Sequence, residues 1–199
     1  MSDTKKARRR GRPRQFDPEE AVARAQHLFH ARGYDAVSVA EVTDSLGIKA
    51  PSFYAAFGNK GGLYRRVLDR YTTTRGIPFD VILSSDRPVA EALEALLEEA
   101  AHRYAEDAEA AGCLVLESLR CEDQEAREAA YALHRAAEEM IRDYIAARHR
   151  KEAERVTDFV STVMAGMSAK AREGYGIERL LAVAALAGAA IARDLQAEA

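Results

Sequence analysis

The sequence predicts an all-α protein, and three observations support this prediction. Apolar residues recur every three or four positions through most of the 199 residues, which is the spacing that gives a helix one buried face. No run of alternating β-branched residues is present, so strands are not expected. Prolines number only 5, too few to interrupt many long helices. Breaks in the apolar pattern divide the chain into about nine expected helices.

The first segment, residues 1–14, is basic and has no apolar periodicity. Because such a segment cannot bury enough apolar surface to fold, we expect a disordered arm. The first helix should begin after Asp17, which can cap it, with Pro18 at the first helical position. It should end at Gly33.

The stretch Ser38–Lys60 has the pattern of a helix-turn-helix. Ser38 and Glu41 have the spacing of a capping box at the start of a short helix. Gly47 can adopt the left-handed conformation that ends this helix and redirects the chain into a second one. The second helix of such a motif can enter the major groove of DNA.

A fourth helix is expected after Asn59, which can cap it. Its first turn contains Gly61 and Gly62 in place of better helix formers, at a cost of about 1 kcal/mol each. Two interpretations of this pair stay open: a frayed helix end, or a pliable joint between two domains.

Breaks in the pattern after this helix predict a domain boundary. We expect a three-helix helix-turn-helix domain at residues 15–72, which the fourth helix joins to an antiparallel helical domain at residues 73–199. The net charge also differs between the two parts of the chain. Residues 1–75 carry 15 Lys and Arg against 8 Asp and Glu, whereas residues 76–199 carry 14 against 24. This asymmetry indicates that the first part meets a polyanion, although solvated surface charge is an alternative.

Several classes of function lack their signals in the sequence. No phosphate-binding glycine loop, nucleophile motif or metal-ligand spacing of His and Cys occurs, so we expect no catalysis, no metal and no cofactor. The longest apolar run has 13 residues, too short to span a bilayer. Two cysteines and the lack of a secretory leader favour a cytoplasmic protein.

Residues 14–64 resemble the N-terminal domain of the TetR family of bacterial transcriptional regulators. The matching motifs follow one another in order and without gaps. They are Phe29…Gly33-Tyr34, Ser38, Val42…Leu46-Gly47-Ile48, and Ser52-Phe53-Tyr54…Phe57-Gly58-Asn59-Lys60. The resemblance implies a homodimeric regulator, most often a repressor, that binds a palindromic operator in double-stranded DNA at the bacterial nucleoid and is released by a small-molecule effector.

The resemblance also implies which residues contact DNA. The third helix would lie near base edges, and residues around it would contact phosphates. Ala55 and Ala56 stand where many members carry a large polar side chain, so base reading should depend on few other residues or on DNA shape. The expected DNA-binding residues are Arg12, Arg14, Ser38, Thr43, Lys49, Ala50, Pro51, Ser52, Tyr54 and Lys60.

An effector pocket is implied among the helices of the second domain. Its candidate residues are His102, Tyr104, Cys113, Leu116, Arg120, Met140, Phe159 and Met164, with ordinary core packing as the alternative for each. Cys113 follows a glycine at the expected start of a helix, where the helix N-terminus could lower the pKa of its thiol. Cys113 is therefore either an electrophile or oxidant sensor, or a small buried apolar residue.

The last two expected helices, at residues 153–172 and 177–196, look apolar on more than one face. Two such helices from each subunit would form a symmetric four-helix bundle. The predicted dimer interface consists of Phe159, Val163, Met167, Ala171, Leu181, Ala184, Ala185, Gly188 and Ile191.

Two alternatives to a ligand-responsive repressor stay open. One is a helical DNA-associated protein that binds without sequence preference and without an effector. The other is a regulator that senses electrophiles or oxidants through its cysteine.

Overall fold

A computed structural model gives the structure of the chain and describes residues 17–83 and 86–196. These residues form ten helices and no strand, which confirms the all-α prediction. The helix that the sequence did not predict is α5, a single turn. The helices are α1 (Pro18–Arg32), α2 (Val39–Leu46), α3 (Ala50–Phe57), α4 (Lys60–Thr74), α5 (Phe79–Ile82), α6 (Val89–Ala105), α7 (Leu114–Ser118), α8 (Gln124–Ala146), α9 (Ala153–Arg172) and α10 (Ile177–Gln196).

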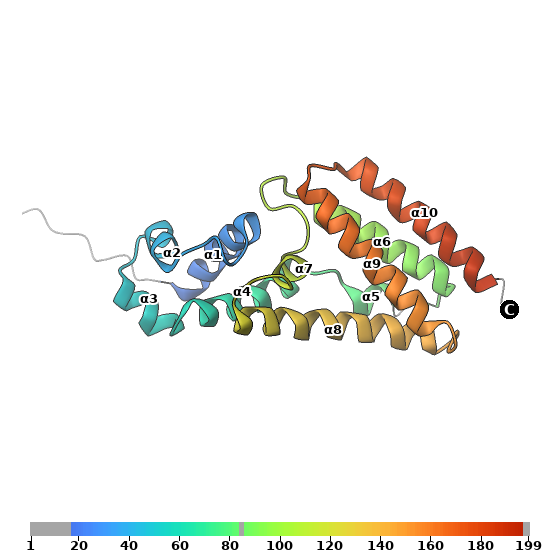
Figure 1. Ribbon diagram of the computed structural model, residues 1–199, viewed down its shortest axis with the longest axis horizontal. Coiled ribbons are helices and arrows are strands. Elements are labelled where there is room, and N and C mark those ends of the chain that lie inside the picture. Colours follow the sequence, from blue (N-terminus) through green and yellow to red (C-terminus); the bar gives the residue numbers. More distant parts are fainter. Residues whose placement is uncertain (1–16, 84–85, 197–199) are drawn as a thin grey trace, which may run out of the picture.

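The molecule is elongated, with α1–α4 at one end and α6, α9 and α10 packed together at the other (Figure 1). Helix α8 runs along the long axis and contacts both α4 and α9. The short helix α7 lies between the two ends. This arrangement puts the helix-turn-helix at one tip of the molecule.

The local signals for the first helices are confirmed. Asp17 caps α1, Ser38 caps α2 in a capping box with Glu41, and Asn59 caps α4. Gly47 ends α2 with φ 65° and ψ 32°, the left-handed conformation expected of this turn. These caps satisfy backbone N–H groups that would otherwise lack partners.

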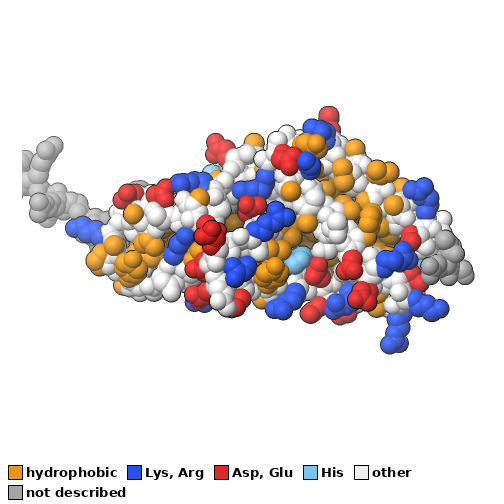
Figure 2. Space-filling view, in the orientation of Figure 1, with side chains coloured by type: hydrophobic (Ala, Val, Ile, Leu, Met, Phe, Trp, Pro, Cys, Tyr) orange, Lys and Arg blue, Asp and Glu red, His pale blue; other side chains and the backbone are white. Residues whose placement is uncertain are grey.

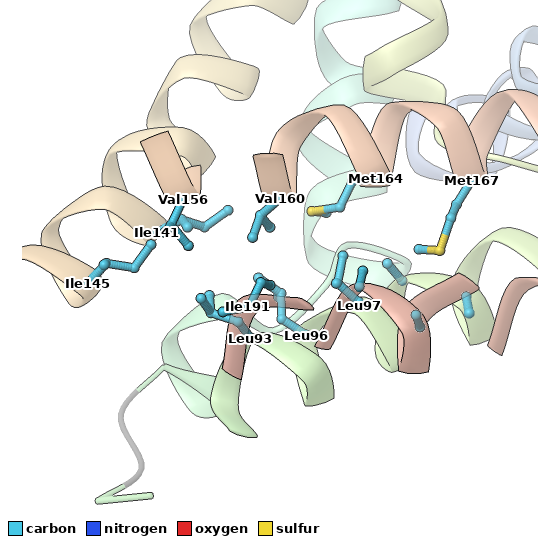
Figure 3. Close-up of a cluster of buried hydrophobic side chains, with 14 of the residues drawn as sticks. Leu93, Leu96, Leu97, Ile141, Ile145, Val156, Val160, Met164, Met167 and Ile191 are labelled. Atoms are coloured by element: carbon cyan, nitrogen blue, oxygen red, sulfur yellow. The ribbon is translucent and has the colours of Figure 1, made fainter. Parts of the chain in front are cut away.

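Two apolar cores hold the helices together. In the larger one, side chains of α6, α8, α9 and α10 point toward one another, among them Leu93, Leu97, Ile141, Val160 and Ile191 (Figure 3). All five are at most 2% exposed, so the four helices are fixed by burial of apolar surface.

The smaller core lies among α1–α4 and includes Phe29, Phe53 and Tyr64. Leu114 of α7 and Ala126 of α8 also pack into it, although both lie well beyond the expected boundary at residue 72. The two ends of the molecule are thus joined by shared apolar packing as well as by α4. The division at residues 72–73 stays a prediction.

Candidate DNA-binding surface and effector cavity

Helix α2 is fixed at its start by a network around Glu41. The backbone N–H of Ser38 donates to the Glu41 carboxylate at 2.9 Å, and the backbone N–H of Glu41 donates to the Ser38 hydroxyl at 3.2 Å. Arg32 at the end of α1 donates to the same carboxylate at 2.8 Å. These hydrogen bonds from Ser38 and Arg32 lower the pKa of Glu41 to about 2. The carboxylate therefore stays charged and holds α2 against α1.

Helix α3 is anchored by two buried rings, Phe53 and Phe57, which pack against each other with centroids 5.4 Å apart. Its other side faces solvent at the tip of the molecule (Figure 1). Tyr54 is 52% exposed, a high value for an aromatic side chain that has no role in the core. The exposed predicted contacts on and before this helix are Lys49, Ala50, Pro51, Ser52 and Tyr54, and Ser38 before α2 is exposed as well. These six exposed residues are called the reading surface below.

Two predicted DNA contacts are not presented to solvent in this way. Thr43 is 7% exposed, and its hydroxyl donates to the carbonyl oxygen of Ala40 at 2.8 Å. The ammonium of Lys60 lies 3.9 Å from the centre of the Tyr34 ring, and partial burial lowers its pKa. Thr43 and Lys60 stay predicted DNA contacts, although each group has a partner within the chain. Arg12 and Arg14 lie outside the described residues.

A cavity of about 360 Å³ lies among α4, α5, α6, α8 and α9. Five of the eight predicted effector residues line it: Tyr104, Cys113, Leu116, Met140 and Met164. The other three do not. His102 and Arg120 are exposed, and Phe159 is 41% exposed on the outer side of α9. The prediction that these three residues line the cavity is corrected: His102 and Phe159 lie on the outward sides of α6 and α9, and Arg120 lies in the exposed turn after α7.

Several residues that line the cavity were not predicted from the sequence, including Tyr71, Arg75, His134, Ala137 and Ser161. The spacing of Leu133, Ala137 and Met140 on α8 did indicate an apolar face. Nothing local indicated that α4 would reach the cavity through Tyr71 and Arg75. In the part of the chain that the structure describes, no group of three or more His, Cys, Asp or Glu side chains is placed to hold a metal ion.

Cys113 departs from the expectation of an activated thiol. Burial raises the pKa of its thiol, and this effect exceeds that of the hydrogen bonds from Leu116, Tyr71 and Val115. The helix that follows, α7, has only five residues. The expectation of a lowered pKa was therefore wrong, since desolvation of the thiolate outweighs a short helix N-terminus.

The segment Ala111–Cys113 links the cavity to the helix-turn-helix domain. The N–H of Gly112 donates to the backbone carbonyl of Tyr104 at 2.9 Å, and His30 Nε2 on α1 donates to the carbonyl of Gly112 at 3.1 Å. The N–H of Cys113 donates to the hydroxyl of Ser168 on α9 at 2.8 Å. One short segment thus contacts α1, α6 and α9.

Two further interactions surround this segment. Arg172 of α9 donates to the carbonyl oxygens of His30 at 3.1 Å and Ala111 at 3.2 Å. Burial lowers the pKa of His30 to about 4, so the imidazole is neutral near pH 7 and carries one N–H for the Gly112 carbonyl.

Part of the predicted dimer interface is buried inside the protomer. Buried within the protomer are Met167, Ala171, Ala184, Gly188 and Ile191. Their prediction as interface residues is corrected, because this side of α9 and α10 packs on α6 instead. The outward sides carry Phe159 (41% exposed), Val183 (42%) and Leu186 (70%) together with Ala185, while Val163 and Leu181 are intermediate.

These outward residues leave apolar surface on the two helices. Hydrophobic side chains are visible among charged ones on the face of the molecule that Figure 2 shows. Exposed apolar patches of this kind mark interaction surfaces. None of the helices in the described ranges, 17–83 and 86–196, is both long and apolar enough to cross a membrane.

Comparison with known proteins agrees with this arrangement. Residues 21–67 match the model of the bacterial regulatory proteins of the TetR family. The chain is 55% identical to the HTH-type transcriptional repressor BdcR of Escherichia coli strain K12 over 196 residues, which cover 98% of this chain and 100% of the relative. It is 30% identical to the repressor ComR of the same strain over 186 residues, or 88% of this chain and 89% of that one.

Among solved structures, the TetR-family regulator CifR, as a cysteine mutant bound to 26-bp double-stranded operator DNA, has 34% sequence identity and a TM-score of 0.78. The match covers 90% of this chain and 99% of that chain. A related CifR complex gives 35% identity and a TM-score of 0.79. The helix-turn-helix at the tip, the helical domain behind it and these relatives lead to one conclusion: the chain belongs to the TetR family of bacterial transcriptional regulators.

Proposed function

We propose that this regulator is a homodimeric repressor that leaves its operator when a small molecule fills the cavity among α4, α5, α6, α8 and α9. The two curated relatives are named as repressors, which supports repression over activation. The observation that carries the proposal is the segment Ala111–Cys113, because it contacts both the cavity and α1.

The route of coupling is short. Cys113 lines the cavity, and the neighbouring Gly112 accepts a hydrogen bond from His30 of α1. A ligand that displaces Cys113 or Leu116 therefore acts on the hydrogen bond that fixes the end of α1. Helix α1 is tied to α2 through Arg32 and Glu41, so α2 and α3 follow its movement.

In a dimer, movement of α3 changes the distance between the two reading helices. A palindromic operator accepts only a narrow range of this distance, since its half-sites are separated by whole turns of DNA. An effector that binds the altered conformation more tightly lowers the affinity for DNA by its differential affinity for the two conformations.

In this proposal, the reading surface and the basic arm recognise the operator sequence. Lys49 and Ser52 can donate to base edges, and Tyr54 offers an exposed hydroxyl to a phosphate. We assign no catalytic reaction to the protein and place its action in the bacterial cytoplasm, at its operator. We propose a division of labour between residues 15–72, which carry the reading surface, and residues 73–199, which carry most of the cavity wall, although Leu114 and Ala126 pack into the smaller core.

The test begins with purified protein, sheared genomic DNA and sequencing of the fragments that it retains. A recovered operator then serves in gel-shift titrations. Lys49→Ala and Tyr54→Ala should each weaken binding about ten-fold, whereas Lys170→Ala on the exposed side of α9 should not. Retention of fragments without a shared sequence would contradict the proposal and favour binding without sequence preference.

A further inference from the structure

We propose that the cavity takes a neutral, largely apolar small molecule with one hydrogen-bond acceptor, such as a carbonyl oxygen, which the hydroxyl of Tyr104 binds. This inference rests on the proposed function, because it concerns the ligand of the same cavity. Its support comes from the charges at the cavity wall, from the apolar lining and from the partners of the polar groups.

The cationic side chains of the wall already have anionic partners. Arg75 lies 3.1 Å from Glu106 and 3.6 Å from Asp107. Arg103 donates to Glu99 at 2.7 Å. An anionic ligand would have to compete with these carboxylates for the same guanidinium groups. Arg75 Nη2 makes no hydrogen bond, but the charge of this guanidinium is already offset by the two carboxylates. A carboxylate or phosphate would therefore find no arginine in the wall without an anionic neighbour.

The acidic groups of the wall do not favour a cationic ligand either. Glu138 lies 3.2 Å from His134 Nε2 and accepts a hydrogen bond from the Ser161 hydroxyl at 2.6 Å. Asp80 is exposed to solvent, where water screens its charge, and it further disfavours an anion. Removing a charged ligand from water without a buried partner would cost several kcal/mol of binding free energy, so a neutral molecule fits this wall best.

Most of the remaining lining residues are apolar. Ile77, Phe79, Leu116, Leu133 and Met140 come from three different parts of the chain and face one cavity. A volume of about 360 Å³ is at the lower end of the roughly 300–1,000 Å³ found for small-molecule sites, so the ligand is small.

Two lining residues carry a buried polar atom without a hydrogen bond in the described chain, Arg75 at Nη2 and Tyr104 at its hydroxyl. Arg75 Nη2 is held 3.1 Å from the Glu106 carboxylate, so Tyr104 provides the neutral donor. It lines the cavity, is 1% exposed, and its hydroxyl has no hydrogen-bond partner within the described chain. Burial raises the pKa of Tyr104 well above its usual value, so the phenol stays a neutral donor. The neighbouring Tyr71 differs, since its hydroxyl is hydrogen-bonded to Cys113.

The unpaired hydroxyl also suits a regulatory site. It is covered in the structure, so an acceptor reaches it only when the surrounding wall shifts. The backbone carbonyl of Tyr104 accepts the N–H of Gly112, whose own carbonyl binds His30. A ligand that accepts a hydrogen bond from Tyr104 thus acts on the segment Ala111–Cys113, which contacts α1.

The test uses four probes that share a benzene ring: acetophenone, ethylbenzene, benzoate and benzylammonium. Ligand-observed NMR titrations of the full-length protein give their dissociation constants. We expect acetophenone to bind about five-fold more tightly than ethylbenzene, the usual effect of one neutral hydrogen bond. Both charged probes should bind at least about thirty-fold more weakly than acetophenone.

Three variants connect this preference to the structure. Tyr104→Phe should bring the ratio between acetophenone and ethylbenzene to about one. Tyr131→Phe, at a 43% exposed tyrosine on α8, should leave the ratio unchanged. Ala137→Phe fills the cavity and should weaken both neutral probes about ten-fold.

The outcomes separate this inference from the proposed function. A charged probe that binds as tightly as acetophenone overturns the inference, and so does a carbonyl preference that survives Tyr104→Phe. In both cases the cavity remains a ligand site. If no probe binds, or if Ala137→Phe changes nothing, the cavity is not the effector site and both the inference and that part of the proposed function fail.

Discussion

The contact between α3 and α4 can be tested by replacing Gly62 with alanine. A Cβ atom at this position would lie 2.1 Å from the carbonyl oxygen of Phe57, far inside van der Waals contact. That oxygen belongs to the backbone of the turn between the two helices, so it cannot rotate away. The matched control is Gly61→Ala, whose Cβ would lie 3.0 Å from the Glu125 carboxylate, the far end of a flexible side chain.

Helix propensity and packing predict opposite results for Gly62. Propensity alone stabilises an alanine over a glycine by about 1 kcal/mol. Forcing a methyl group into filled space costs about 1–3 kcal/mol, and here the clash involves backbone. We therefore expect Gly62→Ala to lower the free energy of unfolding by up to about 2 kcal/mol, and Gly61→Ala to raise it by up to about 1 kcal/mol.

Urea unfolding followed by circular dichroism measures both variants. Subunit concentration must be the same throughout, because the stability of a dimer depends on it. Equal slopes with different midpoints would assign the change to stability. If Gly62→Ala were as stable as Gly61→Ala, the close approach would not constrain this turn, and the pliable joint would regain support as the reason for the glycine pair.

Three further predictions concern other parts of the molecule. His30 has a pKa of about 4 when folded against 6.5 in the unfolded chain, so the unfolded state binds more protons between these values and stability falls as pH decreases from 6.5 to 4. The full loss is roughly 3 kcal/mol, and urea midpoints at pH 7.5 and 5 should show a smaller loss in His30→Gln. Cys113, whose thiol has a raised pKa, should react with iodoacetamide at least about ten-fold more slowly in the native protein than in urea, as followed by mass spectrometry. Leu186→Glu should give a monomer by light scattering, whereas Val81→Glu, at a residue 66% exposed on α5, should remain a dimer; a dimeric Leu186→Glu would rule out this face as the interface.

The parts of the fold that follow from local chemistry could be predicted from the sequence. Caps at Asp17, Ser38 and Asn59 and the turn at Gly47 depend on residues within one or two turns of one another. Their physical causes are therefore visible in a short stretch of sequence. The same holds for the reading surface, since the buried positions of α3 determine which side of the helix faces out.

The predicted dimer face shows what local sequence patterns do not determine, namely which apolar side of a helix becomes buried in the protomer. Helix α10 carries one apolar stripe through Ala184 and Ile191 and another through Val183 and Leu186. Both satisfy helical spacing, and which one becomes internal depends on α6, far away in the sequence. His102 was a different case. It lies two residues from the buried Tyr104, about 200° around the helix, so its outward direction could have been deduced once Tyr104 was placed inside.

The coupling between cavity and DNA reader was hidden for a more general reason. At Ala111, Gly112 and Cys113 the hydrogen bonds to α1, α6 and α9 use backbone N–H and C=O groups. Every residue but proline carries both groups, so the segment itself has no sequence signal for this link. The side chains that complete it, His30, Ser168 and Arg172, lie far away in the sequence. The cavity wall, in contrast, is made of side chains such as Leu116 and Met140. Substitutions in the wall can therefore change which ligand binds while the backbone link to α1 stays the same. In the proposed mechanism, the contact with α1 is therefore independent of which ligand the wall selects.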